Sequence, residues 1–332
     1  MTHTSRSLSL EKISFLIFIG ALSLYVLYEQ VVNCHAIDMA TQLFRHNNVL
    51  EGKSEFFNPW QYRVLSVYLV EFLQLFFLRI FDNPYYAFYF LRFLQNLAIF
   101  VVAYKYYKAL ELKSDFLIVL GILLLGYNMS HSVFQSDLSL NTYFDVLFYL
   151  LAGYLIVMNK ALWILPLIVI AALNRETSIL IPILLAGCAI DFTNKKIANR
   201  QNIKIAVWSL VFFMIIFISL RLYYGMPSAV GIHGMQSPLE YLKFNLTFFR
   251  MYPELFGTLG IIPLIVILRF KSLNNYLRTF FFLLVPVWFI IHFLKSTAVE
   301  TRLFLVPQAL VFIPACLKII EKEIIDKLSI NK

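Results

Sequence analysis

Apolar runs alternate with short polar stretches along the whole chain. They cover residues 13–32, 64–81, 85–104, 115–128, 142–158, 161–173, 177–190, 203–222, 257–270, 278–294 and 302–320. Most approach the length of about 20 residues that a helix needs to cross the hydrocarbon core of a bilayer. The pattern therefore predicts an all-α protein, a polytopic transmembrane helical bundle with about ten membrane helices.

Composition supports this class of protein. Hydrophobic residues make up 60% of the 332 residues and charged residues only 14%, and the mean hydropathy is +0.75. A soluble domain does not have this composition, so we expect residues 1–332 to form a single integral-membrane domain. The net charge of +9 does not indicate a nucleic-acid partner, because membrane proteins concentrate Lys and Arg on the cytoplasmic side.

The first apolar run and the cysteines leave the prediction of a membrane bundle unchanged. The run 13–32 contains Tyr25, Tyr28 and Glu29 and is not followed by a cleavage site, so we interpret it as a first transmembrane helix rather than a signal peptide. The three cysteines are widely spaced, which favours neither a disulfide framework nor a zinc site.

Two topologies fit the apolar runs. In the first, segment 64–81 crosses the membrane and 161–190 is a single broken span. In the second, 64–81 does not cross, and 161–173 and 177–190 form a shallow helical pair. The second leaves more of the 28 Lys and Arg residues, and both termini, on the cytoplasmic side. The positive-inside rule favours this second topology.

The second topology gathers the unusual polar residues on the external side. In this topology, residues 33–84 are the first external loop, which contains juxtamembrane helices. Residues 223–256 form another external loop, and their Gly and Pro content suggests a mobile cover. On a helical wheel of 64–81, the polar residues Arg63, Ser66, Glu71 and Gln74 share one face. That pattern is typical of an amphipathic helix at the interface or beside a cavity.

Charged residues at membrane depth mark the candidate site. Arg92 lies deep in its run and is expected to face an internal cavity or an ion-pair partner. Asn174, Arg175 and Glu176 interrupt two apolar runs that are each too short to span comfortably. They are expected at the tip of the shallow pair, either lining a pocket or tying the pair together.

Other candidates lie at the external ends of the runs. Asp38 follows the first span, Asp137 lies in the loop before 142–158, and Asp145 lies just inside that run. Arg302, with Glu300, precedes the last run. Turn formation is the alternative role for Asp137. Arg63 could hold a lipid phosphate at the headgroup level, and the alternative is that its side chain only snorkels to the interface. The histidine in 223–256, His233, is expected to be incidental.

The order of these short motifs resembles the GT-C class of integral-membrane glycosyltransferases. The motifs are Asp38, PWQYRVL (59–65), Asp137 or Asp145, NRETS (174–178) and ETRLFLVP (300–307). The resemblance implies a GT-C-like fold and a polyprenyl-phosphate sugar donor. It also implies a first-loop aspartate as the catalytic or metal-coordinating acid. The adjacent acidic pair common in the class is reduced here to a lone Asp38.

The resemblance gives each candidate an expected role. Asp38 and Asp137 are the catalytic candidates, and the two together would hold a divalent cation, Mg²⁺ or Mn²⁺, if the enzyme uses one. The donor phosphate and substrate are assigned to Arg63, Arg92, Arg175, Glu176, Arg302 and Asp145. The acceptor would be an envelope glycan, a lipid or a protein, on the external face of a bacterial inner (plasma) membrane.

Physical chemistry agrees with these roles, and other functions stay open. Sugar transfer to a hydroxyl needs a carboxylate that accepts the hydroxyl proton and positive charge that stabilises the departing phosphate. A transporter or flippase of lipid-linked glycans would use the same cavity, and so would a glycan polymerase. A non-catalytic assembly protein is the remaining alternative.

Overall fold

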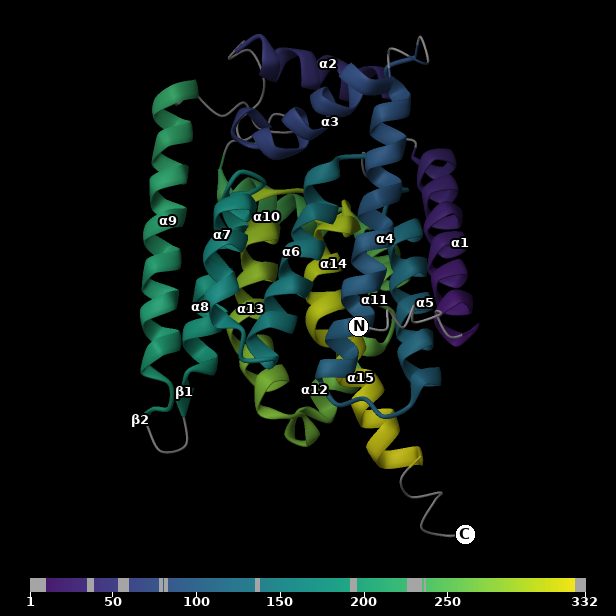
Figure 1. Ribbon diagram of the computed structural model, residues 1–332, viewed down its shortest axis with the longest axis vertical. Coiled ribbons are helices and arrows are strands. Elements are labelled where there is room, and N and C mark those ends of the chain that lie inside the picture. The colour runs from purple at the N-terminus through teal and green to yellow at the C-terminus, as the bar shows by residue number, and fades with distance from the viewer. Residues whose placement is uncertain are drawn as a thin grey trace, which may run out of the picture.

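The computed structural model describes residues 10–34, 39–52, 60–77, 80, 83–134, 138–191, 196–225, 235 and 237–325. They form a helical bundle (Figure 1). Its helices are α1 (Leu10–Asn33), α2 (Met39–Leu50), α3 (Val64–Phe77), α4 (Tyr85–Ala109), α5 (Asp115–His131), α6 (Leu140–Val157), α7 (Ile164–Ala172), α8 (Leu180–Cys188), α9 (Arg200–Tyr224), α10 (Pro238–Thr247), α11 (Met251–Leu259), α12 (Ile262–Leu268), α13 (Asn275–Lys295), α14 (Leu305–Pro307) and α15 (Ile313–Ile320). The strands β1 (Ile190–Asp191) and β2 (Lys196–Ile197) form an antiparallel pair.

The prediction of a helical membrane bundle is confirmed, but the number of about ten spans is not. Six described helices are long and apolar enough to cross a membrane, or seven if the bent pair α11 and α12 is one span. That pair bends by 69° beside Gly260, whose positive φ of 58° suits glycine. Helices α5, α7 and α8 are apolar but shorter.

Helices α2 and α3 form a layer across one end of the bundle (Figure 1). Helix α3 is shorter than the six candidate spans, which agrees with the prediction that 64–81 does not cross. A small cluster of Val49, Val64 and Val67 packs this layer against Leu173 and the end of α9. The layer therefore covers the end of the bundle at which α7 and α9 finish.

Helices α7 and α8 form the helical pair expected from the sequence, with residues 174–176 between them. That this pair is shallow in the membrane stays a prediction. The backbone N–H of Leu65 on α3 donates to the carbonyl of Leu173, just after α7, at 3.1 Å. The far end of α8 leads into β1, at the opposite end of the bundle (Figure 1). The tip at 174–176 therefore lies directly under the α2–α3 layer.

Prolines shape the last span, because proline has no N–H to donate four residues back. Pro307 leaves the carbonyl of Leu303 free, and the indole of Trp288 donates to it at 2.6 Å. Pro314 frees the carbonyl of Leu310 in the same way, and the hydroxyl of Tyr106 donates to it at 2.8 Å. Such substitute donors are required where no water reaches the backbone.

Candidate functional site

The side chain of Asp145 is the centre of a buried polar cluster. It projects from the second turn of α6 and is only 1% exposed. Three groups from the tip of the α7–α8 pair donate to its carboxylate: the Asn174 amide at 2.7 Å, the Arg175 guanidinium at 3.0 Å and the Thr177 hydroxyl at 3.2 Å. Arg175 is itself 8% exposed. A buried carboxylate needs such partners, so the polar interruption at 174–177 folds as the counterpart of Asp145.

Two carboxamides extend the cluster to the α2–α3 layer. The Asn174 amide also donates to the backbone carbonyl of Asn141 at 2.9 Å. The side-chain oxygen of Asn141 accepts a hydrogen bond of 2.7 Å from the Ser66 hydroxyl on α3. Helix α3, the start of α6 and the hairpin tip are therefore joined by one hydrogen-bonded network.

Arg302 and Arg92 reach the same end of α6. The Arg302 guanidinium pairs with Glu300 at 2.8 Å, donates to the Thr142 hydroxyl at 3.3 Å, and is 4% exposed. The Arg92 guanidinium donates to the carbonyl of Leu138 and lies 4.0 Å from the ring centre of Tyr143. Both arginines are thus fixed beside the first turn of α6.

Positive charge exceeds negative charge in this cluster. Burial, with a smaller effect of the nearby Arg175 and Arg302, lowers the pKa of Arg63 to about 10 against the opposing effect of Glu176 and Asp145. Among the described groups of this region, the carboxylates are those of Asp145, Glu176 and Glu300. They stand against five guanidiniums, those of Arg63, Arg92, Arg175, Arg221 and Arg302. The arrangement favours an anion, which would relieve the repulsion between the arginines.

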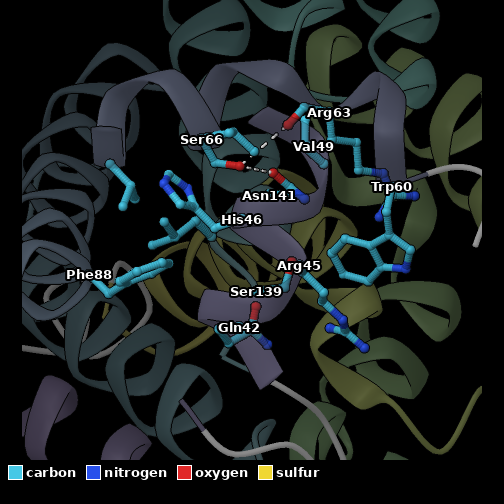
Figure 2. Close-up of a pocket in the computed structure, with 13 residues that line it drawn as sticks. Gln42, Arg45, His46, Val49, Trp60, Arg63, Ser66, Phe88, Ser139 and Asn141 are labelled. Atoms are coloured by element: carbon cyan, nitrogen blue, oxygen red, sulfur yellow. Dashed lines mark hydrogen bonds between the residues drawn. The ribbon is translucent and has the colours of Figure 1, made fainter. Parts of the chain in front are cut away.

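A cleft lies where the α2–α3 layer meets α4 and the start of α6 (Figure 2). Trp60, in the short 3-10 helix Trp60–Tyr62, lies between two guanidiniums, with Arg45 at 4.5 Å and Arg63 at 4.9 Å from the ring centre. Such cation–π contacts hold both charges in place. The cleft is lined by Gln42, Arg45, His46, Val49, Trp60, Arg63, Ser66, Val67, Val70, Phe88, Ser139, Leu140 and Asn141.

Two buried donors border this cleft without a hydrogen-bond partner among the described residues. They are Nε2 of Gln42 and Nε of Arg63. Nε2 of His46 donates to a carboxylate oxygen of Glu71 at 3.2 Å, so Nδ1 of the neutral ring is an acceptor. Buried donors cost free energy unless they are paired. They therefore suit a ligand rich in oxygen acceptors.

Glu176 lies at the margin of the cluster. Its carboxylate lies 3.6 Å from Arg221 near the end of α9, and that guanidinium stacks 4.4 Å from the ring centre of Tyr62. The hydroxyl of Tyr62 donates to the carbonyl of Gly225 at 2.7 Å. Sequence analysis did not select Arg221, although its place in the last turn of an apolar helix is a signal for an interfacial charge.

The structure brings most of the predicted site residues together. Arg63, Arg92, Arg175, Arg302 and Asp145 surround the start of α6, whereas Asp145 is occupied by the hairpin tip rather than free for substrate. The two catalytic candidates, Asp38 and Asp137, lie outside the described residues, as does His233.

A divalent cation does not fit the described part of the cluster. No group of three or more His, Cys, Asp or Glu side chains in the described ranges could hold a metal ion. The arginines that surround Asp145 would also repel a cation. The predicted pair of metal ligands, Asp38 and Asp137, falls in segments that are not described.

Comparison with known proteins adds no family. No family model, no curated protein and no solved structure matches this chain.

Proposed function

We propose that this protein is an integral-membrane glycosyltransferase. It takes a sugar from a polyprenyl-phosphate-linked donor and transfers it to a glycan, lipid or protein acceptor. The observation that carries the proposal is the convergence of Arg63, Arg92, Arg175 and Arg302 on the start of α6, beside a cleft under the α2–α3 layer. The order of motifs in the sequence supports the class of reaction.

Negative charge develops on the phosphate as its bond to the sugar breaks, and positive charge must stabilise it. An acceptor hydroxyl oxygen attacks the anomeric carbon, the bond from that carbon to the phosphate oxygen breaks, and the phosphate leaves with both electrons. Arg63 lines the cleft, and Arg175 and Arg302 lie within electrostatic range of the Arg63 guanidinium. Guanidiniums held in place before the reaction stabilise such a leaving group without reorganising.

A carboxylate must accept the hydroxyl proton. Asp145 is poorly suited, because its oxygens already accept three hydrogen bonds from the hairpin tip. We assign this role to Asp38 on the strength of its place after the first span. The cluster lies beside the α2–α3 layer, which we place at the external surface of a bacterial inner membrane. A lipid phosphate lies at that depth.

A lipid-linked glycan transporter is less well supported. A transporter needs a polar path through the membrane, but the interior of the bundle away from the cluster is closely packed. Fully buried side chains there include Ile99, Phe100, Leu150 and Phe312. The polar side chains Tyr106 and Tyr107 are bonded to backbone carbonyls of the last span.

Complementation tests the proposal. Cells that lack the protein receive wild type, Asp38→Asn, Arg302→Gln or the control Arg250→Gln, whose side chain is exposed, at matched membrane abundance. We expect wild type and Arg250→Gln to restore an envelope glycan, and Asp38→Asn and Arg302→Gln to fail. Full restoration by both Asp38→Asn and Arg302→Gln would show that the assignment is wrong.

A further inference from the structure

We infer that the hydrocarbon chain of the lipid phosphate leaves the cleft between α1 and α4, past Phe88. The inference rests on the proposed function and adds the portal by which the carrier lipid reaches the arginines. It commits to one ligand, a single-chain lipid phosphate whose head lies in the cleft and whose chain extends to the bilayer.

The first step is that two cavities meet at Phe88 and Leu140, which line both the cleft beside Arg63 and a second groove. The groove is lined by Leu27, Val31, Met39, Phe88, Tyr89, Arg92, Leu138 and Leu140. A chain that passes Phe88 therefore goes from a polar cleft into a groove whose described lining residues are apolar apart from Arg92 and the hydroxyl of Tyr89.

The second step is the match between charge and apolar surface. Arg45 and Arg63 stand at the cleft end, held on the two sides of Trp60 (Figure 2). Among the described residues that line the groove, Arg92, beside the start of α6, is the one charged side chain. Cations gathered at one end and apolar side chains at the other match an anionic head with a hydrocarbon tail.

The third step is the direction in which the groove opens. Leu27 and Val31 lie four residues apart on one face of α1, and the neighbouring Val32 is 52% exposed on a helix that counts among the candidate spans. On α4 the large apolar side chain of Phe90 is also exposed. In a membrane such surfaces contact lipid, so the groove leads from the cleft to the hydrocarbon region.

The side of the α2–α3 layer that faces α9 is crossed by polar contacts. Arg221 bridges Glu176 and Tyr62, and Tyr62 is bonded to the carbonyl at Gly225. A hydrocarbon chain on that path would have to separate an ion pair and a hydrogen bond in a poorly solvated place. Among the described side chains that line the route past Phe88, the polar contact is that of Arg92, which donates to the carbonyl of Leu138.

Blocking the groove tests the portal. Purified wild type, Val31→Trp and the matched control Val32→Trp are compared for binding of undecaprenyl phosphate, which has a long chain, and citronellyl phosphate, which has a short one. We expect Val31→Trp to weaken binding of the long-chain lipid by about tenfold and to leave the short-chain lipid unchanged. Val32→Trp, which points to lipid, should bind both as wild type does.

Other outcomes would overturn the inference. One is that Val31→Trp binds both lipids as wild type does, while Leu220→Trp on α9 loses only the long-chain lipid, because the chain would then leave on the α9 side. Photo-crosslinking from position 31, with position 215 on α9 as control, gives an independent readout in protein that is known to fold. Failure of the proposed function would look different: wild type would bind undecaprenol as tightly as undecaprenyl phosphate.

Discussion

Replacing Asp145 by asparagine removes one charge from the centre of the buried cluster and keeps the shape of the side chain. The substitution leaves Arg175 buried without its counter-ion, which lies at 3.0 Å in the wild type. It also replaces an acceptor of three hydrogen bonds with a group that has one acceptor oxygen. Both effects destabilise the folded protein.

The size of the loss in the free energy of unfolding follows from the burial of the Asp145–Arg175 pair. Removing one partner of a buried ion pair costs about 3–5 kcal/mol, mostly because the remaining charge is left uncompensated. Asparagine retains part of the hydrogen bonding, so we expect Asp145→Asn to lower the free energy of unfolding by about 3 kcal/mol. Arg175→Gln should cost a similar amount. The double variant should cost much less than the sum, with a coupling of about 2 kcal/mol or more.

A double-mutant cycle measures this coupling. The four proteins are unfolded reversibly by a denaturing detergent in bicelles, and the free energies are compared at one pH and one lipid composition. Costs that add to within about 0.5 kcal/mol would refute the reasoning, because independent sites add to that accuracy. The hairpin tip would then be held by something other than Asp145.

Three further predictions concern neighbouring parts of the molecule. Burial lowers the pKa of His46 below its ordinary value of 6.5, against a smaller opposing effect of Glu71. The unfolded chain therefore binds the proton more readily than the folded protein, and the stability of the fold should fall as pH drops through about 6.5. The unfolding midpoint of His46→Gln should vary less with pH than that of the wild type. A methyl group on Gly153 would meet the side chain of Leu310 in a closed part of the core, so Gly153→Ala should lose about 1–3 kcal/mol in thermal unfolding, whereas Gly20→Ala, with nothing near the added carbon, should lose none. Glu176→Gln removes a partly exposed pair and should change stability by less than about 1 kcal/mol; a loss as large as that of Asp145→Asn would contradict its marginal place.

The sequence predicted the helices better than their partners. Run length and the positions of Lys and Arg placed 64–81 and the 174–176 tip at one end of the bundle, because both signals are local. The pairing of Asp145 with Arg175 was not predicted, since periodicity gives the face of a helix but not the side chain opposite it. The hydrogen bond from the Trp288 indole to the Leu303 carbonyl is a similar case. Pro307 predicts a free carbonyl four residues earlier, but the packing of α13 determines which side chain donates to it.

The candidate site was predicted in part for the same reason. The predicted topology alone placed Arg63, Arg175 and Arg302 on the same side of the membrane, and the structure brings these three side chains together. The predicted topology could not show that Asp145 is already occupied by the hairpin tip, nor that Glu176 pairs with Arg221. Those outcomes depend on which of several nearby cations each carboxylate meets, which is decided by tertiary packing.

The most direct test of the central claim, that the buried arginines bind a lipid phosphate, compares one lipid with and without its phosphate. Binding of undecaprenyl phosphate and of undecaprenol is measured for wild type and for Arg63→Gln, with Arg250→Gln as control. We predict that wild type and the control bind the phosphate lipid at least about tenfold more tightly than the alcohol, and that Arg63→Gln loses most of this difference. Equal binding of the two lipids by wild type would contradict the account.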